Sequence, residues 1–150
     1  MRSLNFLGKR GAPPDAAAAA AGDAAGRPPT TRVRGQVAED RALAHLQAAG
    51  LRLLARNYRT PGRGGGEIDL VMRAPDGTLV FVEVRSRRGR TAGGAAASVD
   101  AAKQQRIVLA ARHYLLRLSA PPPCRFDVVA LEGDPATGPL QWLRAAFDAG

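Results

Sequence analysis

Residues 67–86 read EIDLVMRAPDGTLVFVEVRS, and this stretch decides the fold. Two runs of apolar and β-branched residues, 67–73 and 78–86, flank the sequence Pro75-Asp76-Gly77. Proline presets one backbone torsion of a turn and glycine tolerates positive φ, so these three residues favour a tight reversal of the chain. The stretch therefore predicts a β-hairpin.

Two carboxylates interrupt the apolar strands of this hairpin, Asp69 in the first and Glu83 in the second. If the hairpin is symmetric about Asp76, paired positions sum to 152 and Asp69 lies opposite Glu83. Like charges whose β-carbons are about 5 Å apart repel each other, so the pair implies a compensating cation, either a metal ion or an arginine. The simpler alternative is a set of ordinary salt bridges on an exposed sheet face, formed with Arg63, Arg73 or Arg85.

The ligand chemistry of the pair favours a hard cation. Two carboxylates and a backbone carbonyl, with water in the remaining positions, suit Mg²⁺ or Mn²⁺. Cys124 is the single cysteine, and His45 and His113 have no partners at ligand spacing, so the sequence predicts no competing zinc site. A metal held in this way could activate water and offset charge on a pentacovalent phosphate, which is the chemistry of phosphodiester hydrolysis.

Hydrophobic periodicity and turn residues predict the elements on either side of the hairpin. Thr31 is the expected N-cap of a first helix that ends at Gly50, and Ser98 is that of a second helix reaching Leu118. The other expected segments are strands at 51–59 and 125–132, a Gly- and Pro-rich loop at 60–66, a mobile surface loop at 87–97, and a short strand or helical turn at 140–147. This order of elements indicates an α/β fold.

The composition bounds the class of protein. A chain of 150 residues fits one domain, and residues 1–30 are rich in alanine, glycine and proline, so we expect a disordered tail before a domain at 31–150. No apolar run approaches about 20 residues, and residues 1–22 lack the apolar core of a secretory signal, which predicts a cytoplasmic protein without a membrane span. The net charge of +9 favours a nucleic-acid partner, although an arginine-rich composition can also reflect genome bias.

The spacing of the two acids resembles a nuclease signature. Asp69, a gap of thirteen residues and then Glu83-Val84-Arg85 is similar to the D…(D/E)-x-K motif of the PD-(D/E)xK nuclease superfamily. Further motifs between residues 32 and 147 resemble the bacterial YraN family, whose members are related to archaeal Holliday junction resolvases. These motifs are Gly35 with Glu39, Arg56-Asn57-Tyr58-Arg59, Gly66-Glu67-Ile68-Asp69-Leu70, Phe81-Val82-Glu83-Val84-Arg85, Lys103 with Arg106, Tyr114-Leu115 and Arg125-Phe126-Asp127-Val128-Val129. The resemblance implies a restriction endonuclease-like αβββαβ core, a mixed sheet with an antiparallel meander flanked by helices.

The resemblance also implies roles for individual residues. Asp69 and Glu83 would ligate Mg²⁺ or Mn²⁺, with the Val84 carbonyl as a third ligand and Glu39 completing the site, although a first-helix glutamate is also an ordinary solvated residue. Arg85 occupies the place of the superfamily lysine. Arginine can stabilise charge in a transition state, but it stays protonated and cannot act as a general base. This departure fits either a drift toward arginine or a domain that binds nucleic acid without cutting it.

The candidate nucleic-acid contacts are Arg63, in the glycine-rich loop, and Lys103 and Arg106, on the second helix. The leading hypothesis is a metal-dependent endonuclease that hydrolyses DNA phosphodiester bonds, on a branched form if the resemblance to resolvases extends to the substrate. That last role would need a homodimer, because two strands must be cut symmetrically. The alternatives are a catalytically inactive nucleic-acid-binding module and an interaction protein whose basic surface binds an acidic protein partner.

Overall fold

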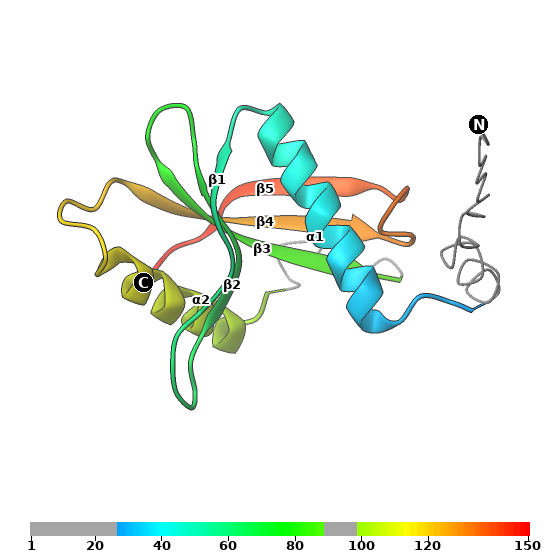
Figure 1. Ribbon diagram of the computed structural model, residues 1–150, viewed down its shortest axis with the longest axis horizontal. Coiled ribbons are helices and arrows are strands. Elements are labelled where there is room, and N and C mark those ends of the chain that lie inside the picture. Colours follow the sequence, from blue (N-terminus) through cyan, green and yellow to red (C-terminus); the bar gives the residue numbers. More distant parts are fainter. Residues whose placement is uncertain (1–26, 89–98) are drawn as a thin grey trace, which may run out of the picture.

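The computed structural model describes residues 27–88 and 99–150. Within them the chain forms two helices and five strands, in the order expected from the sequence (Figure 1). These elements are α1 (Thr31–Ala48), β1 (Arg52–Arg59), β2 (Glu67–Arg73), β3 (Leu79–Arg87), α2 (Ala101–Leu115), β4 (Cys124–Glu132) and β5 (Leu140–Phe147).

The strands form one mixed sheet in the order β1-β2-β3-β4-β5. Neighbouring strands are antiparallel except for β3 and β4, which are parallel and are connected in sequence through α2. The expected α/β class, with an antiparallel meander followed by a helical crossover, is therefore confirmed. Residues 140–147, which the sequence left open between strand and helical turn, form the edge strand β5.

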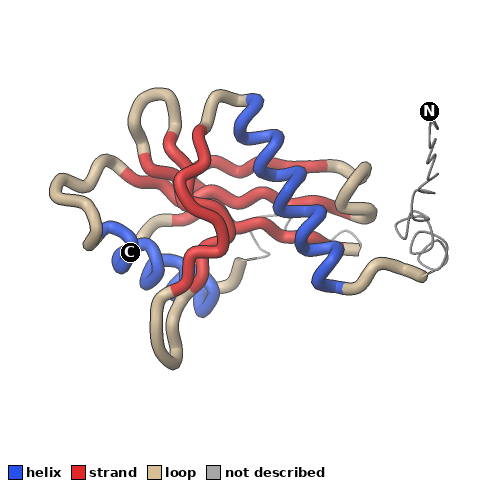
Figure 2. Tube along the Cα trace, in the orientation of Figure 1, coloured by secondary structure: helices blue, strands red, loops and turns tan. Residues whose placement is uncertain are grey.

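The two helices cover opposite sides of this sheet, and each buries an apolar face. From α1, Ala38, Ala42 and Leu46 pack with Val80 and Val82 of β3. From α2, a set of buried side chains packs against Phe81 of β3 and Phe126 and Val128 of β4; the set is Ile107, Val108, Ala110 and Ala111. Figure 2 shows α1 crossing one layer of strands while α2 lies on the other side of it. Strand β3 thus contributes to both cores, because its successive side chains point to alternate faces.

The hairpin between β2 and β3 has the expected register. Its paired residues run from Arg73 with Leu79 to Leu70 with Val82, and each pair of positions sums to 152. The turn is held by a hydrogen bond from the Ala74 N–H to the Thr78 carbonyl, and Gly77 has a φ of 90°, which favours glycine. The ladder ends at Leu70 and Val82, one position before the acid pair.

Both predicted N-caps were wrong. Thr30 caps α1, because its backbone is extended and its Oγ1 accepts a hydrogen bond from the Val33 N–H at 3.2 Å. Asp100 caps α2, since its Oδ1 accepts from the Lys103 N–H at 2.8 Å, whereas Ser98 lies outside the described residues. Helix α2 also ends at Leu115, where the chain turns from helical bonding to tighter turns, and does not reach residue 118.

Two further expectations concern segments that the structure does not describe in full. Residues 1–26, which form most of the expected tail, lie outside the described residues, as do residues 89–97 of the expected surface loop. In the described ranges, neither helix combines the length and the apolar character that crossing a membrane requires.

Candidate metal and nucleic-acid site

The acid pair lies where the ladder between β2 and β3 ends. Beyond Leu70 and Val82, the side chain of Asp69 replaces the next backbone pairing, because its Oδ2 accepts a hydrogen bond from the Val84 N–H at 2.8 Å. This bond fixes the Asp69 carboxylate against β3, beside Glu83. The structure therefore brings the two acids together as the hairpin register predicts.

Glu83 is a buried carboxylate with only 3% of its side chain exposed. Its Oε1 lies 3.5 Å from the Lys103 Nζ and 3.8 Å from the Arg85 Nη1. Its Oε2 is buried without a hydrogen-bond partner among the described residues. Burial, and next the charge of Asp69, raise the pKa of Glu83 to about 8, although the charges of Lys103 and Arg85 oppose this rise.

The pKa of the Asp69 carboxyl group is raised as well. Burial raises this pKa above its usual value, while the hydrogen bond from the Val84 N–H, a hydrogen bond with the Glu83 side chain and the charge of Lys103 lower it. Two adjacent carboxylates that are both buried cannot both ionise at low cost unless a further positive charge lies between them. The orphaned Glu83 Oε2 is a vacant acceptor of the kind that a cation would satisfy.

Glu39 on α1 lies close enough for its charge to interact with that of Asp69. Burial, and next the Asp69 carboxylate, raise the pKa of Glu39, and its Oε2 accepts from the Arg56 Nη2 at 3.4 Å. Over residues 27–88 and 99–150, however, no three acidic, histidine or cysteine side chains converge into a ready metal-binding group. Glu67, two residues before Asp69 on β2, pairs with Arg59 across the β1–β2 ladder at 3.3 Å.

The available donors fit a hard divalent cation. The pair supplies carboxylate oxygens only, and one of them is buried without a hydrogen-bond partner in the part of the chain that the structure describes. Mg²⁺ and Mn²⁺ prefer oxygen ligands and commonly keep several waters, so two protein carboxylates are an adequate core for such a site. In the structure the Val84 backbone contributes its N–H to Asp69; a role for its carbonyl as a third ligand stays a prediction.

Lys103 reaches the acids because α2 packs closely on the start of β2. A Cβ on Gly66 would overlap the backbone oxygen of Arg106, so only glycine allows this approach. The contact places the first turn of α2, which carries Lys103, above Glu83. The sequence indicated Lys103 as a phosphate contact but gave no reason to place it beside the acid pair. The feature of the sequence that could have indicated this position is Gly66, which allows α2 to pack closely on β2.

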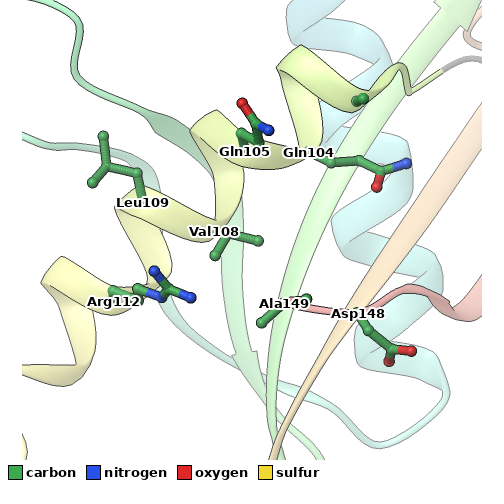
Figure 3. Close-up of a pocket in the computed structure, with 9 residues that line it drawn as sticks. Gln104, Gln105, Val108, Leu109, Arg112, Asp148 and Ala149 are labelled. Carbon is green, nitrogen blue, oxygen red and sulfur yellow. The ribbon is translucent and has the colours of Figure 1, made fainter.

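The other two predicted basic contacts are Arg106, on α2, and Arg63, in the loop before β2. Arg106 lines a shallow cleft of about 350 Å³ together with Gly64 of the 60–66 loop, while Arg63 is exposed in that loop. A different cleft, of about 500 Å³, lies between α2 and the C-terminal residues of the chain (Figure 3). Gln104, Leu109 and Asp148 are in its lining, and none of the predicted site residues is.

A second buried acid, Asp127 of β4, has a structural role, because its hydrogen bonds connect β4 and β5. Its carboxylate accepts hydrogen bonds from the Arg125 Nε, the Trp142 Nε1 and the Ala145 N–H, at 2.9 to 3.2 Å. Its side chain is completely buried and both oxygens have partners. Ala145 has a φ of 49°, in the left-handed region, so the carboxylate also secures an irregular point of β5.

Comparison with known proteins gives a consistent result along the chain. A family model described as "Uncharacterised protein family UPF0102" matches residues 38–131, which include the hairpin and most of the two helices. A UPF0102 protein of Paracidovorax citrulli is 71% identical over 126 residues, or 84% of this chain and 90% of the relative. A UPF0102 protein of Verminephrobacter eiseniae is 60% identical over 149 residues and is covered over 99% of both chains.

Proposed function

The chain belongs to the UPF0102 family, and we propose that it is a metal-dependent endonuclease that hydrolyses DNA phosphodiester bonds. The observation that carries this proposal is the buried Glu83 carboxylate beside Asp69, one oxygen of which has no hydrogen-bond partner within residues 27–88 and 99–150. An unsatisfied buried carboxylate is costly, so its retention at the end of a hairpin favours a function over a role in stability.

In this proposal Asp69 and Glu83 hold Mg²⁺ or Mn²⁺, and Glu39 and the Val84 carbonyl are further ligands. The ion would supply Lewis acidity toward a phosphate oxygen and lower the pKa of a water molecule. The protein's own contribution is positional: the Val84 N–H fixes Asp69, and burial in the sheet fixes Glu83. Both carboxylates therefore need little reorganisation to bind a cation.

Lys103 and Arg85 supply the positive charge of the site. Their side chains are 31% and 35% exposed, so each can reach a phosphate in solvent while it remains close to Glu83. Arg85 stays protonated and acts only electrostatically, by stabilising negative charge that develops on the phosphate. Arg63 and Arg106 extend the positive surface, and the net charge of +9 favours association with DNA.

A second candidate function is a module that binds nucleic acid without cutting it. The observation that favours it is Arg85, which replaces the lysine of the nuclease motif. In that case the two acids would be held by Lys103 and Arg85 alone. Both candidate functions include binding of nucleic acid, and they differ in whether the protein also cleaves it.

The decisive experiment incubates the purified protein with branched, single-stranded and duplex DNA in Mg²⁺ or Mn²⁺, beside an Asp69→Ala/Glu83→Ala double variant. Cleavage by the wild type and not by the variant supports the nuclease. Cleavage that persists in the variant would come from another source and would refute the assignment. Salt-dependent binding without any cleavage would support the binding module, and the absence of both would favour an acidic protein partner.

A further inference from the structure

A cleft of about 530 Å³ opens between the first turn of α1 and the end of β3. Its lining residues are Thr31, Arg34, Gly35, Ser86 and Arg88. Among the described residues, this lining offers two guanidinium groups and two hydroxyl groups, without a carboxylate. Guanidinium groups carry only donors and match the oxygens of a phosphate, so the chemistry of the cleft suits an anion.

Gly133, in the turn after β4, is hydrogen-bonded to both walls of this cleft. Its carbonyl accepts a hydrogen bond from the Arg34 Nη2 at 2.8 Å, and its N–H donates to the Arg87 carbonyl at 2.7 Å. The Arg34 guanidinium is thus held in place by the turn after β4. A guanidinium has five N–H donors, and among the described residues one acceptor, the Gly133 carbonyl, is bonded to Arg34, so donors remain for a ligand. The wall formed by α1 is therefore organised before any ligand arrives.

The cleft lies on the α1 side of the sheet, beside the end of β3 that follows the acid pair. Ser86 follows Glu83 by three residues on β3, about 10 Å at the rise of a strand, and its side chain points to the opposite face of β3 from that of Glu83. Beyond Val82, β3 is no longer paired with β2, so a nucleic-acid strand that passes this open edge can reach both faces. Gly35 precedes Glu39 by one turn of α1, about 6 Å along the helix axis. A duplex strand advances about 3.4 Å per nucleotide along its axis, so a separation of about 10 Å corresponds to roughly three nucleotides.

We propose that this cleft binds a phosphate of the nucleic-acid strand about two to four nucleotides from the bond that faces the acid pair. The proposal rests on the proposed function, because it takes the same nucleic acid as the ligand. Arg34 and Arg88 contact the phosphate, and the hydroxyl groups of Thr31 and Ser86 complete its hydrogen bonding. This contact sets how the strand is positioned along α1 and β3, independently of base sequence.

The first test places a charge in the cleft at Gly35. A Cβ at this position meets no atom within 4 Å among the described residues, so a side chain can leave the backbone here without a clash at its first atom. Gly35→Glu adds a carboxylate to the cleft, and Gly35→Gln is the matched control with the same shape and no charge. We expect Gly35→Glu to bind a labelled oligonucleotide about tenfold more weakly than Gly35→Gln does, in EDTA at low salt.

The second test locates the phosphate on the strand. A series of oligonucleotides carries one neutral methylphosphonate linkage at each position in turn, and their binding to wild type and to Arg88→Ala is compared. In the wild type, one position should lose about threefold to tenfold in affinity, and Arg88→Ala should abolish that loss. Arg52→Ala, an exposed arginine at the opposite end of the hairpin strands, should leave the position dependence unchanged.

The outcomes separate this proposal from the nuclease proposal. Equal binding by Gly35→Glu and Gly35→Gln, or an unchanged methylphosphonate profile in Arg88→Ala, would overturn the cleft assignment even if the protein cleaves DNA. A shifted profile in Arg88→Ala supports the cleft even if no cleavage is detected. If the wild-type protein does not bind the oligonucleotides in any salt, both proposals are overturned.

Discussion

The Asp69 carboxylate accepts a hydrogen bond from the Val84 backbone N–H at 2.8 Å, just beyond Leu70 and Val82, the last paired residues of the β2–β3 ladder. A side chain therefore replaces a backbone acceptor where the two strands separate. The backbone pairing of β2 and β3 therefore stops beside Asp69 and Glu83.

The raised pKa of Glu83 predicts how the metal-free protein responds to pH. The ordinary pKa of this carboxyl group is 4.5, and burial followed by the charge of Asp69 raises its folded-state pKa to about 8. Between these values the folded protein binds a proton that the unfolded chain has released. The free energy of unfolding should therefore fall as the pH rises from about 4.5 to about 8, by an amount on the order of a few kcal/mol.

Urea denaturation in EDTA at a series of pH values measures this slope, with Glu83→Gln as the matched control. Glutamine keeps the shape of the side chain but does not titrate, so the variant should be nearly flat over this range and more stable than wild type near pH 8. A slope that Glu83→Gln leaves unchanged would show that another group is responsible.

Divalent metal should reverse the effect of pH on wild-type stability. Mg²⁺ or Mn²⁺ competes with the proton for Glu83, so its affinity should rise as the pH rises from about 4.5 to about 8. Bound metal stabilises the folded state, and the melting temperature should increase with metal concentration. Thermal melts with Mn²⁺ or Mg²⁺ and with neither measure the effect. Asp69→Asn and Glu83→Gln should abolish the increase, and an equal increase in both variants would place the metal elsewhere.

The hairpin was predictable from the sequence because its information is local. The Pro75-Asp76-Gly77 turn fixes the loop, and the alternation of apolar residues fixes the register, so the approach of Asp69 to Glu83 followed from counting. The helix caps were less determined, since adjacent residues such as Thr30 and Thr31 are equally good caps and tertiary packing selects one. Lys103 was placed wholly by the docking of α2, a long-range contact that periodicity does not contain.

The close contact between Gly66 and α2 predicts a sensitive position. A methyl group in Gly66→Ala would overlap the Arg106 carbonyl, so α2 must move away from β2. We expect a loss of about 1–3 kcal/mol in the free energy of unfolding and a further loss of cleavage, because Lys103 moves with the helix. Gly35→Ala, whose Cβ meets open space in α1, is the stability control and should not be destabilised. Denaturation that is equal for the two variants would contradict the packing interpretation.

The buried carboxylate of Asp127 should matter for stability and not for chemistry. Asp127→Ala leaves the Arg125 guanidinium and the Trp142 N–H without their acceptor, which should cost about 3–5 kcal/mol in the free energy of unfolding. Asp134→Ala, in an exposed turn, is the control and should lose much less. Cleavage per folded molecule, measured well below the melting temperature, should be retained in both variants. A selective loss of cleavage in folded Asp127→Ala would instead assign this acid to the site.

Substitutions of Lys103 can distinguish a role in DNA binding from a role in the cleavage step, because the Lys103 Nζ lies 3.5 Å from a buried oxygen of Glu83. Lys103→Met keeps the aliphatic stem and removes the charge, whereas Lys103→Arg keeps the charge. If the ammonium group stabilises charge in the transition state, Lys103→Met should lower kcat about 10²-fold or more, while DNA affinity falls far less. Lys103→Arg should recover part of the rate. Kinetics at saturating DNA, with the free energy of unfolding of each variant as a control, measure the difference. A rise in KM with an unchanged kcat would reduce Lys103 to a simple phosphate contact.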